Sequence, residues 1–304
     1  MSTEFYSNGK LLLSGEYLVL DGAMALSIPT KYGQSMVVEP SEAGRLDWKS
    51  VDNNGAIWFE NSFAFSELNF TKNPIRTPIS KKDTLLKILQ EAKKLNPEFL
   101  EKSNGCSVTT KLHFPQNWGL GSSSTLINNI AQWAKINAFE LLRKSFGGSG
   151  YDIAVAQNDS PILYKIQDDV PFVEKVEIHW SFTDQLFFVH LNQKQSSKEG
   201  IAHYRKSPIS IIELSKVSAI THSLLACETL EIFEKLIDKH EILISEIIQT
   251  PTIKTQLFSE YQRSIKSLGA WGGDFILVTA TSQDLDYFRN NGYNTIIPFA
   301  EMIL

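Results

Sequence analysis

The segment from Pro115 to Leu126, PQNWGLGSSSTL, constrains the fold of this chain more than any other. It follows an alternating stretch, Gly105–His113, that predicts a β-strand, and it leads into a helical pattern at Ser124–Ile136. Gly119-Leu120-Gly121-Ser122-Ser123-Ser124 therefore connects a strand to the start of a helix through small, flexible residues.

This connection has two interpretations. The first turn of a helix carries unpaired N–H groups and a partial positive charge, and glycines let the backbone close on a phosphate. Serine hydroxyls can add hydrogen bonds to phosphate or bind Mg²⁺. The same residues can also form an ordinary turn in which a serine caps the helix. No GK[ST] follows, so the loop is not a Walker A loop.

Composition and charge limit the classes of partner. The chain has 304 residues, 42% hydrophobic and 21% charged, so it can bury a core as one large domain or two ordinary ones. Its net charge of −5 disfavours nucleic acid and anionic membranes as the main partner. No apolar run reaches the ~18 residues of a membrane span, and the N-terminus lacks a signal-peptide pattern. Two distant cysteines, Cys106 and Cys227, favour a cytoplasmic location. Nothing indicates the oligomeric state.

The remaining patterns predict an α+β protein with two packed lobes. The first third is β-rich: Lys10–Leu20 gives two short apolar runs, and Asn53-Asn54-Gly55 predicts the turn of a hairpin. The other elements expected are strands at Ser35–Glu39, Pro161–Ile166, Gln185–Leu191, Phe275–Ala280 and Thr295–Pro298, and helices at Asp83–Leu95, Ile209–Leu225, Thr229–Ile248, Ile253–Lys266 and Asp284–Asn291.

Two further stretches accompany the serine loop. The first, GKLLLSGEYLVLDG, spans Gly9–Gly22, and the second, GAWGGD, spans Gly269–Asp274. Together with Pro115 and the Gly119–Ser124 loop they resemble the three signatures of the GHMP kinases, the superfamily of galactokinase, homoserine kinase, mevalonate kinase and phosphomevalonate kinase. Tyr17–Asp21 is similar to the phosphomevalonate kinase version of the first signature. Trp271 stands where the third signature has a glycine.

A fourth stretch, SGYDIAVA at Ser149–Ala156, resembles the element that carries the catalytic aspartate in mevalonate kinase-like members, and GYDIA is typical of a bacterial subgroup. The resemblance implies that Asp152 accepts or orients the proton of the acceptor hydroxyl. Without the resemblance, the alternative interpretation is that Asp152 is a carboxylate that interacts favourably with a helix N-terminus.

The resemblance implies the GHMP kinase fold, with a ribosomal-protein-S5-like N-terminal domain at residues 1–160, a ferredoxin-like C-terminal domain at 161–304, and ATP between them. It implies ATP- and Mg²⁺-dependent transfer of a phosphoryl group to a small alcohol. Mevalonate or phosphomevalonate, in isoprenoid synthesis, is the expected acceptor because the first, third and fourth stretches are most similar to those members.

The resemblance also implies roles for single residues. Lys10 assists Asp152, and Ser123 binds Mg²⁺ or phosphate. Glu140 is a candidate second metal ligand, although its spacing to Asp152 differs by one residue from that in relatives, a rotation of about 100° on a helix, so a solvated glutamate is an equal alternative. The triphosphate would be held by Gly119, Leu120, Gly121, Ser122, Ser123 and Ser124, with Gly269, Ala270, Gly272 and Gly273 beside it.

Glu16, Tyr17 and Asp21 occupy the positions that hold the acceptor in relatives. Tyr17 replaces the histidine of mevalonate kinases, which leaves the acceptor open. Three other functions also stay open: a diphosphomevalonate decarboxylase, a kinase for another alcohol such as homoserine or a sugar, and a non-catalytic nucleotide-binding paralogue. The presence of both Lys10 and Asp152 argues against the last, because a binding module needs neither.

Overall fold

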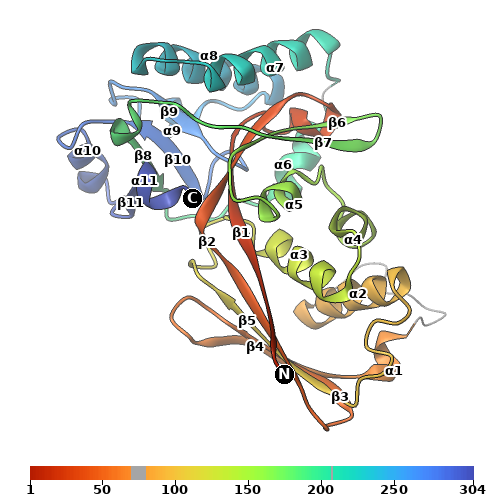
Figure 1. Ribbon diagram of the computed structural model, residues 1–304. Coiled ribbons are helices and arrows are strands. Elements are labelled where there is room, and N and C mark those ends of the chain that lie inside the picture. Colours follow the sequence, from red (N-terminus) through yellow and green to blue (C-terminus); the bar gives the residue numbers. More distant parts are fainter. Residues whose placement is uncertain (70–79, 207) are drawn as a thin grey trace. The chain divides into compact units, whose positions relative to one another are not determined.

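The computed structural model describes residues 1–69, 80–206 and 208–304 (Figure 1), with the Ser197 side chain outside the description. The chain forms two compact units that interleave in sequence. Unit 1 consists of Met1–Gly9, Tyr32–Gln116 and Leu120–Gln157, and unit 2 consists of Lys10–Lys31, Asn117–Gly119 and Asn158–Leu304. The strands β1 (Thr3–Ser14) and β2 (Ala25–Pro40) contribute to both units. The domain boundary at residue 160 stays a prediction.

Unit 1 contains the predicted hairpin. The strands β3 (Arg45–Val51) and β4 (Ile57–Ala64) pair antiparallel, and β5 (Cys106–Leu112) runs parallel to β3. On its other edge, β5 pairs antiparallel with the second half of β2, where Gln34 lies opposite Leu112. The alternation that predicted these strands places every second side chain in the core of the unit.

Helices cover this sheet and supply the other half of the core. They are α1 (Phe65–Leu68), α2 (Lys81–Leu95), α3 (Ser122–Ala134), α4 (Ala138–Ser145) and α5 (Tyr151–Ala156). Ile88 on α2, Ile130 on α3 and Leu141 on α4 pack with Trp48 and Val108 of the sheet. The helix predicted after the serine loop is therefore confirmed, and it begins two residues earlier than expected, at Ser122.

The first part of unit 2 follows the start of the chain. The first half of β2 pairs with β6 (Ile162–Gln167), which pairs with β7 (Val170–Lys175). The second apolar run of Lys10–Leu20 does not continue the β structure, because Gly15 and Tyr17 both have positive φ and turn the chain. Leu18–Asp21 forms the 3₁₀ turn η1, with Leu18 and Val19 buried.

A second sheet forms the rest of unit 2, in the order β11-β8-β10-β9, with every neighbouring pair antiparallel. Ile276 and Val189 lie opposite each other and face a core that includes Phe288, whereas Leu277 and Phe188 alternate to the other face. The strands are β8 (Leu186–His190), β9 (Ile265–Ser267), β10 (Phe275–Thr279) and β11 (Ile296–Pro298), and the helical elements are η2 (Thr183–Gln185), α6 (Ser197–Tyr204), α7 (Ile211–Leu225), α8 (Leu230–Ile248), α9 (Ile253–Leu257), α10 (Leu285–Asn290) and α11 (Phe299–Met302).

The single helix predicted over Ile253–Lys266 is wrong. The helix α9 ends at Leu257, and the last residues form β9, which pairs with β10. Phe258, Tyr261 and Ile265 all pack into the same core, so their spacing of three and four residues imitates one face of a helix. β9 instead alternates, with Ile265 in that core and Lys266 facing the other way, where its ammonium meets Glu241 of α8.

Within the described ranges, none of the helices combines the length and the apolar character that crossing a bilayer requires. Both cysteines are buried and free.

Candidate active site

In unit 1, the serine loop ends at an uncapped helix. Gly121 occupies the N-cap of α3 with φ 90°, a left-handed conformation that glycine adopts without strain, and it offers no side chain to the first N–H groups. Ser123 is exposed and Ser122 partly so. Ser124 is buried, and its Oγ donates to the Gly121 carbonyl at 2.8 Å. A phosphate at this helix start could therefore meet the hydroxyls of Ser122 and Ser123, and only the backbone of Ser124.

Asp152 lies in the first turn of α5, where its Oδ1 accepts a hydrogen bond from the Ile153 N–H at 3.1 Å. The preceding Gly150 has φ 86°, so the sharp entry into this helix needs a residue without a side chain. The Asp152 side chain is half-buried. A carboxylate at this position can accept a proton from a bound hydroxyl.

A network of polar side chains, buried except at Gln157, links α5 to α3 within unit 1. Gln157, which caps α5, donates to Asn128 Oδ1 on α3 at 2.9 Å, and Asn128 donates to Ser7 Oγ at 2.9 Å. Ser7 in turn donates to Asn129 Oδ1 at 2.7 Å, and Asn129 donates to the Gln34 carbonyl at 3.0 Å. The network sets the position of the helix that carries Asp152 relative to the helix that follows the serine loop.

In unit 2, the second and third signature stretches meet at Gly119. A Cβ placed on Gly119 would lie 2.3 Å from Cγ of Asp274, so the carboxylate rests directly on this glycine. Burial raises the pKa of Asp274, although the positive charges of Lys10 and Lys194 act in the opposite direction. Asp274 of the third stretch thus contacts Gly119 of the second, and the charge of Lys10 in the first stretch acts on the Asp274 carboxylate.

The segment after β8 holds the third stretch in place. The N–H of Asp274 donates to the Gln193 carbonyl at 2.9 Å, and Gln193 donates through its side chain to the Gly272 carbonyl. Gly273 packs against Gln195, since a Cβ on this glycine would lie 2.7 Å from the Gln195 nitrogen. This packing explains why small residues are needed at this position of the loop.

Trp271, the departure from the third signature, points into the protein. Its side chain is 6% exposed and packs with Leu18, Tyr204 and Ile244. The tryptophan side chain therefore contributes to the core beside η1, α7 and α8, and the backbone N–H of Trp271 donates to the Tyr17 hydroxyl at 3.2 Å.

The three residues expected to hold the acceptor differ in their surroundings. Glu16 is fully buried and forms an ion pair with Lys266. Tyr17 is half-buried and stacks on Tyr204, with ring centroids 5.6 Å apart. Asp21 is exposed and accepts hydrogen bonds from the Tyr204 hydroxyl at 2.5 Å and from Arg205 at 2.7 Å. Tyr204 therefore contacts both residues, Tyr17 through its ring and Asp21 through its hydroxyl.

Glu140 lies in the first turn of α4 and pairs with Lys144 at 3.5 Å, one helical turn away, with 39% of its side chain exposed. This environment matches the alternative of a solvated helix glutamate. No group of three or more His, Cys, Asp or Glu side chains suited to a metal occurs among the residues that the structure describes. Mg²⁺ does not require one, since it often takes one or two carboxylates and completes its shell with phosphate and water.

Sequence reasoning missed two groups of residues. The first is the network of Asn128, Asn129 and Gln157, for which two adjacent asparagines inside an otherwise apolar helix were a signal, because asparagine is a weak helix former. The second is the buried set of His240, Glu241 and Lys266, for which the sequence carries no signal, since Lys266 lay inside a predicted helix.

The comparisons with known proteins concern the fold. No protein-family model and no curated protein matches the sequence. Among solved structures, Methanococcus jannaschii mevalonate kinase is 15% identical with a TM-score of 0.72, and the match covers 98% of this chain and 97% of that one. Streptococcus pneumoniae phosphomevalonate kinase, in complex with phosphomevalonate and AMPPNP, is 18% identical with a TM-score of 0.69 and 95% coverage of both chains. Lactococcus lactis galactokinase, in complex with galactose, is 13% identical with a TM-score of 0.66, covering 95% of this chain and 88% of that one.

These three enzymes are a mevalonate kinase, a phosphomevalonate kinase and a galactokinase, which are members of the superfamily that the motifs resemble. The matches extend over nearly the whole chain, so the similarity is not confined to one half. The chain has the α+β fold of the GHMP kinases, as its motifs predicted.

Proposed function

We propose that the protein is an ATP-dependent kinase that transfers the γ-phosphoryl group to the hydroxyl of a small molecule, mevalonate or phosphomevalonate. The observation that carries the proposal is the contact of the Asp274 carboxylate with Gly119, together with the charge of Lys10 that acts on this carboxylate. The three residues are far apart in sequence, yet Asp274 lies directly against one glycine of the serine loop. A turn that served only to connect a strand and a helix would need neither charge.

The nucleotide is assigned to the two glycine-containing loops. The uncapped first turn of α3, with the hydroxyls of Ser122 and Ser123, offers donors for phosphate oxygens. Gly269, Ala270, Gly272 and Gly273 form the second loop, in which Gly269 and Gly272 have open space where a side chain would be. Such space lets a phosphate approach the backbone closely.

Mg²⁺ would neutralise charge on the triphosphate, and each unit offers a candidate ligand for it. In unit 2, Asp274 carries a buried oxygen, Oδ1, that has no hydrogen-bond partner among the described residues. In unit 1, Ser123 is exposed, and its role as a ligand rests on the motif resemblance. Carboxylate and hydroxyl oxygens are the donors that Mg²⁺ prefers. Glu140 is the weaker candidate because Lys144 already pairs with it.

Asp152 and Lys10 are assigned to the chemical step. Asp152 orients the acceptor hydroxyl and takes its proton as the oxygen attacks the γ-phosphorus and the bond to ADP breaks. The ammonium group of Lys10 stabilises the negative charge that develops during transfer. The products are ADP and the phosphorylated alcohol.

The acceptor follows from the first and third stretches, which are similar to those of mevalonate and phosphomevalonate kinases. Two structures that share the fold support the choice, since they are a mevalonate kinase and a phosphomevalonate kinase. A galactokinase shares the fold as well, so sugars belong in the test.

The test is ADP release by the purified protein from Mg-ATP with mevalonate, phosphomevalonate, diphosphomevalonate, homoserine and galactose. Rapid turnover with one of the first two supports the proposal and identifies the acceptor. Turnover of diphosphomevalonate with release of CO₂ would make the protein a decarboxylase instead. ATP binding without turnover of any acceptor would contradict the proposal and favour a nucleotide-binding paralogue.

A further inference from the structure

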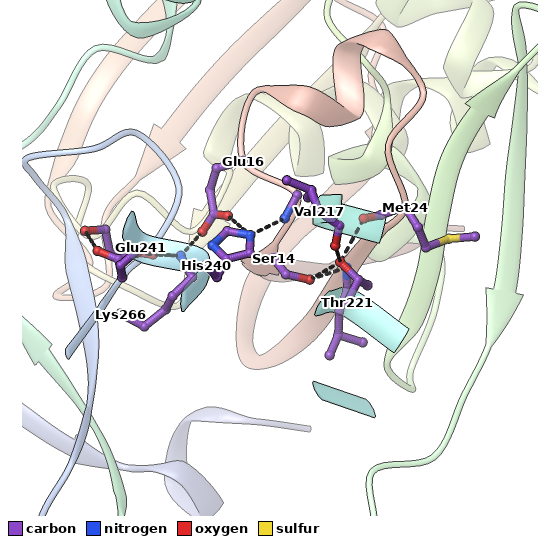
Figure 2. Close-up of polar contacts among 11 residues, drawn as sticks. Ser14, Glu16, Met24, Val217, Thr221, His240, Glu241 and Lys266 are labelled. Atoms are coloured by element: carbon purple, nitrogen blue, oxygen red, sulfur yellow. Dashed lines mark hydrogen bonds and ion pairs between the residues drawn. The ribbon is translucent and has the colours of Figure 1, made fainter. Parts of the chain in front are cut away.

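Four titratable side chains of unit 2, Glu16, His240, Glu241 and Lys266, lie together (Figure 2), and the first of them belongs to the turn that also contains Tyr17. Glu16 comes from this turn, His240 and Glu241 from α8, and Lys266 from β9. Their exposed fractions are 0% for Glu16, His240 and Lys266 and 3% for Glu241. Such burial of charged groups is unfavourable unless they are paired, so we call these four residues the buried ion cluster and ask what it stabilises.

Lys266 lies at the centre of the buried ion cluster. Its ammonium group donates to Oε1 of Glu16, lies 3.1 Å from Oε1 of Glu241, and donates to the Ser267 carbonyl at 2.5 Å. The second oxygen of Glu241 accepts a hydrogen bond from Ser267 Oγ at 2.8 Å. One lysine thus contacts two acidic side chains, and the one that belongs directly to the Tyr17 turn is Glu16.

His240 holds the same turn by its backbone. Its Nε2 accepts a hydrogen bond from the Gly15 N–H at 3.2 Å, which requires this nitrogen to be unprotonated. Gly15 has φ 91° and lies so close to Ala25 that a Cβ would be 2.7 Å from the Ala25 Cβ. Gly15 and Glu16 are therefore fixed by partners on α8, β9 and β2.

The residue that follows them is strained. Tyr17 has φ 61° and ψ −48°, and the Leu18 N–H donates to the Glu16 carbonyl at 2.7 Å across it. This is a γ-turn of the positive-φ kind, which is rare and unfavourable for a residue with a side chain. Strained backbone persists only where the surroundings determine it, and it concentrates at functional sites.

The Tyr17 side chain is fixed as well. Its ring stacks on Tyr204, and its hydroxyl accepts the Trp271 N–H at 3.2 Å. The hydroxyl also lies against Gly200, where an added Cβ would be 2.5 Å away. The structure therefore holds Tyr17 at both its backbone and its ring, which packing of a surface turn would not require.

We propose that Glu16, through its buried pair with Lys266, is a positioning residue that holds the Tyr17 γ-turn in the conformation that binds the acceptor. The proposal rests on the proposed function, and it changes the role of Glu16 from a direct acceptor contact to support for Tyr17. Glu241 also contacts Lys266, but its hydrogen bond goes to Ser267 and not to the turn, which makes it the natural comparison.

The experiment compares E16Q with E241Q, two identical substitutions in the same cluster. Steady-state kinetics would give KM for the acceptor and for ATP, and hydrogen–deuterium exchange would report on the amides of residues 15–21. E16Q is expected to raise the acceptor KM roughly 10-fold or more and to speed exchange in this segment, with KM for ATP unchanged. E241Q is expected to leave both KM values and the exchange of the segment as in the wild type.

Three results would overturn the proposal. They are unchanged exchange in E16Q, faster exchange without a selective rise in the acceptor KM, or an equal effect of E241Q. If E16Q does not fold, the triple variant E16Q/E241Q/K266M removes all three charged groups that pair in the cluster and is expected to fold with the same selective rise in KM. A wild type that turns over no acceptor would refute the proposed function and the acceptor role of the turn, while the exchange data would separately show whether Glu16 holds the turn.

Discussion

The carboxylate of Asp274 rests on the α-carbon of Gly119, at a distance that leaves no room for a methyl group. The two residues belong to stretches more than a hundred positions apart, and the charge of Lys10 acts on the same carboxylate. The contact shows why the serine loop begins with glycine, and it gives the proposed nucleotide site its first test.

Replacing Gly119 by alanine should destabilise unit 2 and weaken ATP binding. The new Cβ would lie 2.3 Å from Asp274 Cγ, and φ at this position is 64°, which disfavours alanine by about 1 kcal/mol before any clash. G44A is the matched control, because Gly44 has φ 68° and open space around it. Urea unfolding should show a larger loss for G119A than for G44A. Equal losses would mean that the contact with Asp274 adjusts freely.

Replacing Asp152 by asparagine should slow turnover without preventing nucleotide binding. The amide keeps the shape of the side chain but cannot take the proton of the acceptor, a contribution of about 10²–10⁴-fold in kcat. The matched control is D83N, since Asp83 also lies in the first turn of a helix, α2. Kinetics with the best acceptor and ATP titration would be measured for both variants. Full turnover by D152N would remove Asp152 from the mechanism.

Replacing Asn128 by leucine should destabilise unit 1. Asn128 is 1% exposed and bonds to both Ser7 and Gln157, so leucine would remove two hydrogen bonds, a loss of about 1–3 kcal/mol. Q132L is the control on the same helix, where the side chain is exposed and a change within about 0.5 kcal/mol is expected. Urea unfolding midpoints of the wild type, N128L and Q132L would measure the two losses of stability. A small effect of N128L would show that the network is dispensable for the packing of α5 on α3.

Most of the fold could be predicted because its elements follow local rules. The hairpin of β3 and β4 was visible in the Asn54-Gly55 turn, and β5 and α3 in the switch from alternating to helical periodicity. The helix expected over Ile253–Lys266 failed because Phe258, Tyr261 and Ile265 satisfy the same periodicity without being helical. Pairing of β9 with β10 is a long-range property that no local window contains.

The candidate site likewise has a part that the sequence could predict and a part that it could not. The glycines and serines of the loops could be identified because their chemistry depends on residue type and order. The surroundings of Glu16 could not, since its partner Lys266 is 250 positions away, and a buried lysine is rare enough that sequence favours exposure. The direction of Trp271 was likewise undetermined, because a tryptophan in a glycine loop can face a ligand or a core.

The pH dependence of stability should reveal the buried ion cluster. Burial raises the pKa of Glu241 to about 7, against the opposing charge of Lys266 and with the help of the Glu16 charge. The folded state binds the Glu241 proton more tightly than the unfolded chain does. Protonated Glu241 therefore stabilises the folded protein, fully below pH ~4.5, and this contribution is lost as the pH rises through about 7. His240 remains neutral over this range, since burial lowers its pKa well below the ordinary value.

E241Q is the variant that isolates this effect, because glutamine resembles the protonated acid and does not titrate. The free energy of unfolding of the wild type should fall relative to E241Q between pH 5 and pH 8, by on the order of 3 kcal/mol in total. E246Q, on the exposed side of α8, controls for the loss of one acidic residue. Urea unfolding of the three proteins across this range measures the difference. A wild type and E241Q that stay parallel would show that Glu241 is ionised in the folded protein at every pH tested, and that Lys266 stabilises two buried carboxylates at once.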